Sequence, residues 1–189
     1  MITVDDLADR QSKIFDALKR RHADLDRYAY TIRSLRSLNV AQNEEYQRTF
    51  NGLYMVRRNA SWRSKFYGLL ETCKTDSEPK FVMVLDKLFK ETGRFEASFA
   101  SKLIATINPA FPVYDSIVRI NLGLPQRSSR GSDRIELLST DYASIQGHSS
   151  ELTKNLKFQE LRATFDKQFP EFMDFSDAKV LDLMIWQVR

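Results

Sequence analysis

The sequence predicts an all-α fold, a compact multi-helix single domain. Apolar residues recur at steps of three and four over most of the chain, which is the spacing of amphipathic helices. Only six glycines and five prolines occur in 189 residues, and no two alternating segments are joined by a hairpin turn. A chain of this length can bury a sizeable core. We therefore treat residues 1–189 as one helical domain, with an N-terminal region 1–39 and a core region 40–189.

The N-terminal region 1–39 is amphipathic. Thr3 is a residue type that caps helix starts, and Asn39 marks the end of the pattern. We expect one long helix, or a helix pair broken near His22, packed onto the rest of the domain. The alternative is a homodimer formed as a coiled coil through residues 3–38. The apolar positions behind both interpretations are Leu7, Ile14, Leu18, Leu25, Tyr28, Ile32 and Leu35.

Four helices are expected between residues 44 and 107. Asp76 or Ser77 is expected to cap the third of them. Gly93 separates the last two, because glycine is favoured where a helix ends. Residues 81–85 could also form a strand, but their polar flanks fit a buried helix better. The expected helices are 44–56, 61–73, 77–89 and 95–107.

A proline-containing turn is expected at residues 108–112. Each proline disfavours helix at the residue before it, so the preceding helix cannot continue through this segment. Asp115 or Tyr114 restarts a short helix that runs to about Leu122. Gly123 then stops it.

The C-terminal part predicts a loop and three helices. Residues 125–134 are polar and predict a surface loop. Ser176 caps a last helix that has almost no polar face and should therefore be buried. The two helices before it are expected from the apolar spacing of Ile135, Leu138, Tyr142 and Ile145, and of Leu152, Leu156, Leu161 and Phe165.

Several classes of site are excluded by missing motifs. No glycine-rich phosphate loop, HExxH zinc motif or GxSxG nucleophile motif is present. The two histidines, His22 and His148, lie in different segments, and Cys73 is the single cysteine. One cysteine can form neither an internal disulfide nor a cysteine zinc cluster. We therefore expect no metal and no cofactor.

The composition also bears on location. A single cysteine favours a reducing compartment, no run of about eighteen apolar residues occurs, and the acidic N-terminus does not resemble a secretory signal. We expect a cytoplasmic protein. The net charge of +4 and the pI of about 9.2 are compatible with nucleic-acid binding, so in a bacterial cell it could associate with the nucleoid.

Aromatic and basic residues interleave between positions 46 and 67. Such a pattern can stack bases while it contacts phosphates. The alternative interpretation fits the three-to-four spacing better: the aromatic residues form the core faces of two helices and the basic residues are solvated. The residues concerned are Tyr46, Phe50, Tyr54, Arg57, Arg58, Trp62, Arg63, Lys65, Phe66 and Tyr67.

A lysine and an aspartate flank the turn at residues 108–112. Lys102 lies within an otherwise apolar helix, and Asp115 heads the next one. If the turn folds the second helix back, both side chains could face one cleft. Burial there would favour the neutral amine that a nucleophilic lysine needs. The alternative is that Lys102 is solvated and Asp115 only caps its helix.

These residues resemble the helix-hairpin-helix DNA glycosylase superfamily. Lys102 matches the catalytic lysine of that family. The segment Phe111-Pro112-Val113-Tyr114-Asp115-Ser116-Ile117-Val118-Arg119 resembles the segment that carries its aspartate. The similarity covers residues 95–124. Where the family hairpin has Leu-Pro-Gly-Val-Gly, this chain has Glu96-Ala97-Ser98-Phe99-Ala100. The Lys-to-Asp interval is also shorter than usual, and no four-cysteine iron–sulfur pattern follows.

The resemblance implies a base-excision DNA glycosylase/lyase that acts on double-stranded DNA. Lys102 would form a Schiff base with the sugar, and Asp115 would stabilise the sugar cation. The residues expected to bind the base or the phosphates are Tyr54, Arg57, Arg58, Trp62, Phe111, Tyr114 and Arg119. The alternative is a non-catalytic helical module that binds DNA or a protein partner, which the missing glycines favour.

Overall fold

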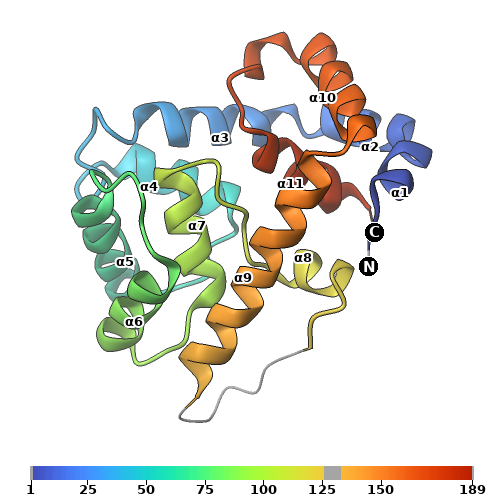
Figure 1. Ribbon diagram of the computed structural model, residues 1–189. Helices are drawn as coiled ribbons and strands as arrows, with labels where there is room; N and C mark the ends of the chain where they lie inside the picture. Colours follow the sequence, from blue (N-terminus) through green and yellow to red (C-terminus); the bar gives the residue numbers. More distant parts are fainter. Residues whose placement is uncertain (1, 126–132, 189) are drawn as a thin grey trace.

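The computed structural model describes residues 2–125 and 133–188. These ranges contain eleven α-helices and one short 3-10 helix (Figure 1). No strand occurs in these ranges, so the all-α prediction is confirmed. Most of the loop predicted at 125–134 lies outside the described residues. In chain order the helices are α1 (Val4–Asp9), α2 (Gln11–Arg20), α3 (His22–Ser34), α4 (Glu44–Leu53), α5 (Ala60–Cys73), α6 (Phe81–Thr92), α7 (Ala97–Ile107), α8 (Ser116–Asn121), α9 (Arg134–Thr153), α10 (Leu156–Gln168), η1 (Pro170–Phe172) and α11 (Asp177–Gln187).

The N-terminal region forms three helices where one or two were expected. Thr3 caps α1 in a reciprocal capping box with Asp6. Arg10 and Arg21 leave helical geometry, with ψ of 8° and 25°, and interrupt the helical run twice. The break beside His22 was predicted. The break at Arg10 was not, because no glycine or proline marks it.

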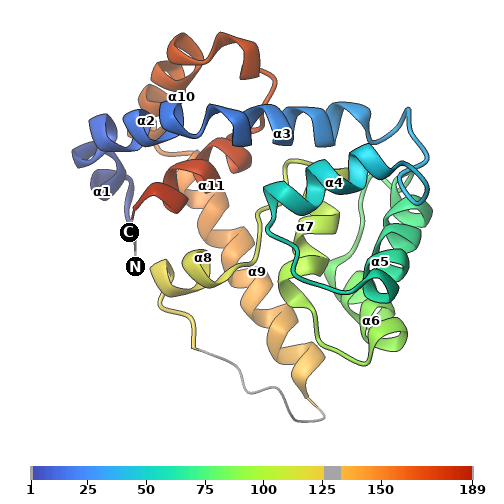
Figure 2. The ribbon, with the colours of Figure 1, turned by 180° about the vertical axis from the view of Figure 1, so that it is seen from behind.

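Helices α2 and α3 lie across one side of the molecule, over α11 and α4 (Figure 2). The apolar stripe that predicted a coiled coil is therefore covered by helices of the same chain. A homodimer through residues 3–38 would have to use other surfaces. The buried members of the stripe are Leu7, Ile14, Leu18, Leu25, Tyr28 and Leu35.

Helix α7 lies in the middle of the domain and contacts α6 and α3. Nine of its eleven residues are buried. Its two buried hydroxyls are hydrogen-bonded: Ser101 to the carbonyl of Ser98, and Thr106 to that of Lys102 at 2.7 Å. The amine of Lys102, by contrast, has no hydrogen-bond partner among the described residues.

Two boundary errors of the prediction lie at α4 and α6. Helix α4 ends at Leu53, three residues early, because Met55 takes a left-handed conformation with φ of 48°. The N–H of Val56 then bonds the carbonyl of Asn51 at 2.9 Å, as in a Schellman cap. Helix α6 begins at Phe81, later than expected, because Pro79 disfavours helix just before it.

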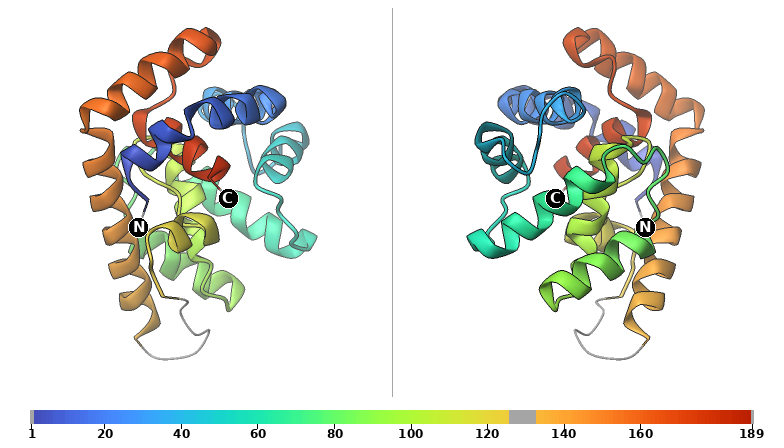
Figure 3. Two further views of the ribbon diagram at one scale, coloured as in Figure 1. Left: turned by 90° about the vertical axis from the view of Figure 1, so that its right-hand side faces the viewer. Right: turned by 90° about the vertical axis from the view of Figure 1, so that its left-hand side faces the viewer.

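The remaining helices follow the predicted order. Gly93, with φ of 69°, ends α6 as expected, and residues 81–85 are helical. Leu152 belongs to α9, which is longer than the apolar pattern indicated. Figure 3 shows α9 along one side of the molecule with α10 folded over its end.

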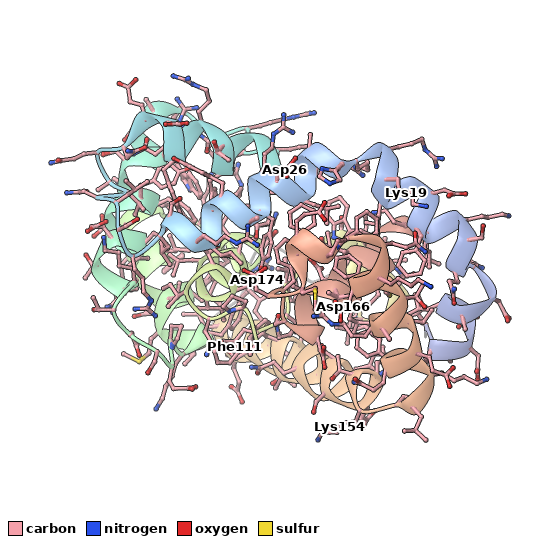
Figure 4. The ribbon with its side chains drawn as sticks, turned by 90° about the horizontal axis from the view of Figure 1, so that it is seen from above. Lys19, Asp26, Phe111, Lys154, Asp166 and Asp174 are labelled. Atoms are coloured by element: carbon pink, nitrogen blue, oxygen red, sulfur yellow. The ribbon has the colours of Figure 1, made fainter. Side chains whose placement is uncertain are left out.

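Helix α11 is buried, as predicted, and contacts α2, α8, α9 and α10. Ser176 caps it by accepting a hydrogen bond from the N–H of Lys179. The segment before it is tied to α3 by an ion pair between Arg33 and Asp174 at 2.6 Å (Figure 4). Among the described residues, no helix combines the length and the apolar content that a membrane span requires.

Candidate functional site

A pocket opens between α11, the start of α3, the end of α4, α7 and the segment before α8, and its empty space of about 630 Å³ includes open solvent. Leucine side chains form much of its wall, and four buried charged side chains, from α7, α11 and the residue that caps α8, line it together with two aromatic side chains. The lining residues are Leu18, Arg21, Asp24, Leu25, Leu53, Tyr54, Lys102, Val113, Asp115, Lys179, Asp182, Leu183, Trp186 and Gln187.

The turn at residues 108–115 is held against α7 by side-chain hydrogen bonds. The hydroxyl oxygen of Ser101 accepts from the N–H of Tyr114 at 2.8 Å. The hydroxyl of Tyr142 donates to the carbonyl of Pro112 at 3.0 Å, and that of Ser176 donates to Pro109. These contacts fix where the next helix starts. They therefore bring Asp115 into the same pocket as Lys102, as the sequence predicted.

Lys102 is 8% exposed, so the interpretation of a solvated lysine is wrong. Its Nζ lies 5.3 Å from the ring centre of Tyr54 and 5.2 Å from that of Phe99. It makes no hydrogen bond or close ion pair with any described residue. Burial lowers the pKa of Lys102, although the nearby carboxylates of Asp115 and Asp182 oppose this. The neutral amine therefore forms more readily in this site than it does in water.

Asp115 combines the two roles that the sequence left open. Its Oδ1 accepts from the N–H of Val118 at 2.8 Å and caps α8, yet the residue is 6% exposed and lines the pocket. Burial, and then the charge of Asp182, raise the pKa of Asp115. The Val118 amide, Lys102 and the Trp186 indole act in the opposite direction.

A second charged pair lies in the pocket and was missed from the sequence. Nζ of Lys179 and Oδ2 of Asp182 are 2.9 Å apart on α11, and both side chains are buried. Nζ of Lys179 also lies 4.3 Å from the ring centre of Tyr28. Burial alone would lower the pKa of Lys179, but Asp182 raises it above its ordinary value. The signal was present as two charged residues, three apart, on a helix predicted to be buried.

The predicted base-stacking residues do not all meet at the pocket. Tyr54 lines it. Trp62 is 7% exposed and stacks on Phe66 at 5.2 Å in the core, and Tyr114 is also buried in the core. Phe111 is half-buried against the same core. Burial in the core corrects the expectation for Tyr114, whereas Trp62, although largely buried, also lines a groove beside the start of α5.

The predicted phosphate-binding arginines divide between two places. Arg57 and Arg58 lie in a groove beside the start of α5, together with Lys65 and Arg94. Arg58 pairs with the buried carboxylate of Glu96 at 2.9 Å. Arg119 is not part of this groove: it lies on α8 and donates to the carbonyl of Leu124 at 3.1 Å.

One aromatic ring, that of Phe99, lies near a residue of the basic groove and a residue of the pocket. The guanidinium of Arg58 lies 5.7 Å from the ring centre of Phe99, and Nζ of Lys102 lies 5.2 Å from it. Tyr54, in the pocket wall, is also joined to Arg57 and Arg58 through the short segment 55–56. A ligand that spans both places would therefore contact adjoining parts of the chain.

A scan of family models and searches of the curated proteins and of the solved structures found no match to this chain. Within the part of the chain that the structure describes, no three His, Cys, Asp or Glu side chains are grouped to hold a metal ion.

Proposed function

We propose that this chain is a DNA-binding protein that acts as a base-excision glycosylase/lyase, with Lys102 as the nucleophile. The observation that carries the proposal is that Lys102, a buried residue whose amine has no close ion-pair partner among the described residues, lies in one pocket with Asp115. A buried lysine without such a partner is costly to the fold, which is typical of functional positions.

The proposed reaction uses the neutral form of Lys102. Nζ attacks C1′ of the sugar, the glycosidic C1′–N bond breaks, and the base leaves with the bonding electrons and takes up a proton. Asp115 stabilises the positive charge that develops on the sugar. The ring then opens at O4′, which takes the proton lost by Nζ, and a protonated Schiff base remains. Loss of a C2′ proton with cleavage of the 3′ C–O bond breaks the strand, and water releases the enzyme.

The proposed reaction requires DNA as the partner. The target base must leave the base stack of the duplex to reach a pocket of this kind. Arg57, Arg58, Lys65 and Arg94 form a basic groove next to it, and contacts to phosphates would be salt-dependent. The proposed partner is double-stranded DNA, and the proposed location is the bacterial cytoplasm with the nucleoid.

Borohydride trapping tests the proposal. Full-length protein is mixed with a duplex that contains one abasic site, and the reductant fixes any Schiff base as a covalent adduct. We expect an adduct with the wild type and none with Lys102→Met. Lys154→Met is the matched control, since Lys154 is exposed at the periphery (Figure 4). Equal trapping by both variants, or none by the wild type on any substrate, would count against it.

A non-catalytic module that binds DNA is the second candidate. The observation that favours it is the stretch in place of the family hairpin: Glu96 precedes α7, and residues 97–100 are its first helical turn, without glycine. This turn lacks the positive-φ positions that glycine provides. Duplex binding that weakens with salt but gives no adduct would favour this candidate over the enzyme.

A further inference from the structure

The carboxylate of Asp182 has one oxygen that no described residue uses. Asp182 is 8% exposed, and its Oδ2 is paired with Nζ of Lys179 at 2.9 Å. Its Oδ1 is buried and accepts no hydrogen bond among the described residues. A buried carboxylate oxygen that accepts no hydrogen bond costs the fold more free energy than a buried neutral oxygen without a donor. Since Asp182 lines the pocket, a donor on a bound ligand could supply the missing bond.

The position of this oxygen is fixed before any ligand arrives. Asp182 lies on the buried helix α11, and its ion pair with Lys179 restrains the side chain. Lys179 is restrained in turn by its contact with the ring of Tyr28. An acceptor held in this way does not have to be ordered on binding, so it can discriminate between ligands more sharply than a mobile side chain.

The rest of the pocket fits a flat heterocycle. Leu25, Leu53 and Leu183 provide apolar walls, and the rings of Tyr54 and Trp186 provide aromatic surface. A planar ring with apolar faces and polar edges satisfies both the walls and the unpaired oxygen.

We propose that Asp182 is the specificity-determining residue of the pocket, and that Oδ1 accepts a hydrogen bond from an exocyclic amino group at the edge of the base. The substrate class is a purine or pyrimidine that carries such a donor. This inference rests on the proposed function, since it names the base that would be excised. Lys102 and Asp115 act on the sugar, whereas Asp182 reads the base.

Free bases test the inference without DNA. Binding to the full-length protein is measured by calorimetry for two matched pairs, adenine against purine and guanine against hypoxanthine, in which the first member has an additional amino group. A hydrogen bond to a charged acceptor predicts that the amino-bearing base binds at least about tenfold more tightly. Asp182→Asn should reduce this preference to about twofold or less. Asp177→Asn, on the exposed part of the same helix, should keep it.

The wild-type comparison decides the matter even if Asp182→Asn fails to fold. Equal affinity for both members of each pair, no binding of any base, or a preference that survives Asp182→Asn would each overturn the role of Asp182. Trapping of the wild type on the abasic duplex separates this result from the proposed function, because that substrate has no base. An adduct without base preference would leave the lyase proposal standing and remove only this inference.

Discussion

Replacing Lys102 with methionine is expected to stabilise the fold while it removes the proposed nucleophile. Methionine has a similar length and no charge, and the surroundings of Lys102 include the rings of Tyr54 and Phe99 and no close ion-pair partner among the described residues. The desolvation of the ammonium is thus relieved, while the weaker attraction to Asp115 is lost.

The expected gain is about 1 kcal/mol at neutral pH, at the low end of the range found when buried ion pairs are replaced by apolar groups of similar volume. For a domain of this size the gain corresponds to a rise in Tm of about 2–4 °C. Thermal unfolding followed by circular dichroism measures it, with Lys154→Met as the control that should stay close to the wild type.

The pH dependence gives the same prediction a second test. Because the pKa of Lys102 is lowered in the folded state, the unfolded chain binds more protons between that pKa and about 10.4. Stability of the wild type relative to Lys102→Met should therefore rise with pH through this window. Destabilisation of Lys102→Met by about 1 kcal/mol or more at neutral pH would refute the reasoning, since it would mean that the lysine is a structural ion-pair partner.

Two other predictions concern the scaffold. Met55→Gly should stabilise the chain by about 0.5–1 kcal/mol, because φ of 48° suits glycine. Met83→Gly, at an exposed position within α6, should instead destabilise it by about 1 kcal/mol. Chemical denaturation measures both, and changes in the free energy of unfolding that have the same sign would contradict this. The hydrogen bond to Glu171, and then that to Asp26, raise the pKa of His22, so its contribution should be complete below pH ~6.5 and fall as pH rises through the raised pKa. The difference in Tm between wild type and His22→Gln should shrink from pH ~5.5 to pH ~8.5, and a difference that is independent of pH would show that the histidine acts only by packing.

The helix ends that could be predicted are those set by local chemistry. Ser176 and Asp115 each bond an amide three residues on, and Gly93 supplies the left-handed position after α6. Such interactions depend on neighbouring residues alone. The end of α4 was misplaced because methionine, at Met55, takes a role that glycine usually fills. The break at Arg10, where φ is −104°, was missed because neither glycine nor proline marks it.

The candidate site could be predicted only in part. Lys102 and Asp115 were found because one turn joins their helices, and the hydroxyl of Ser101 fixes that turn. Lys179 and Asp182 come from α11, far along the chain, and reach the pocket through the packing of α11 against α2 and α8. Neither has a local pattern that reveals its neighbours.

The aromatic residues show a different error, in which a side chain expected to contact a base packs in the core. Trp62 was expected at a base because it lies among arginines, but the face of α5 that carries it packs against Phe99 of α7, with ring centres 4.6 Å apart. The spacing that favoured a core face was the better guide. Arg57 is exposed and remains available to a phosphate.

The central claim is that Lys102 is a nucleophile, and borohydride trapping on an abasic duplex tests it most directly. The account predicts a covalent adduct with the wild type whose labelled peptide contains Lys102, and no adduct with Lys102→Met although that variant folds at least as stably. An adduct that persists in folded Lys102→Met, or maps to another lysine, would contradict it.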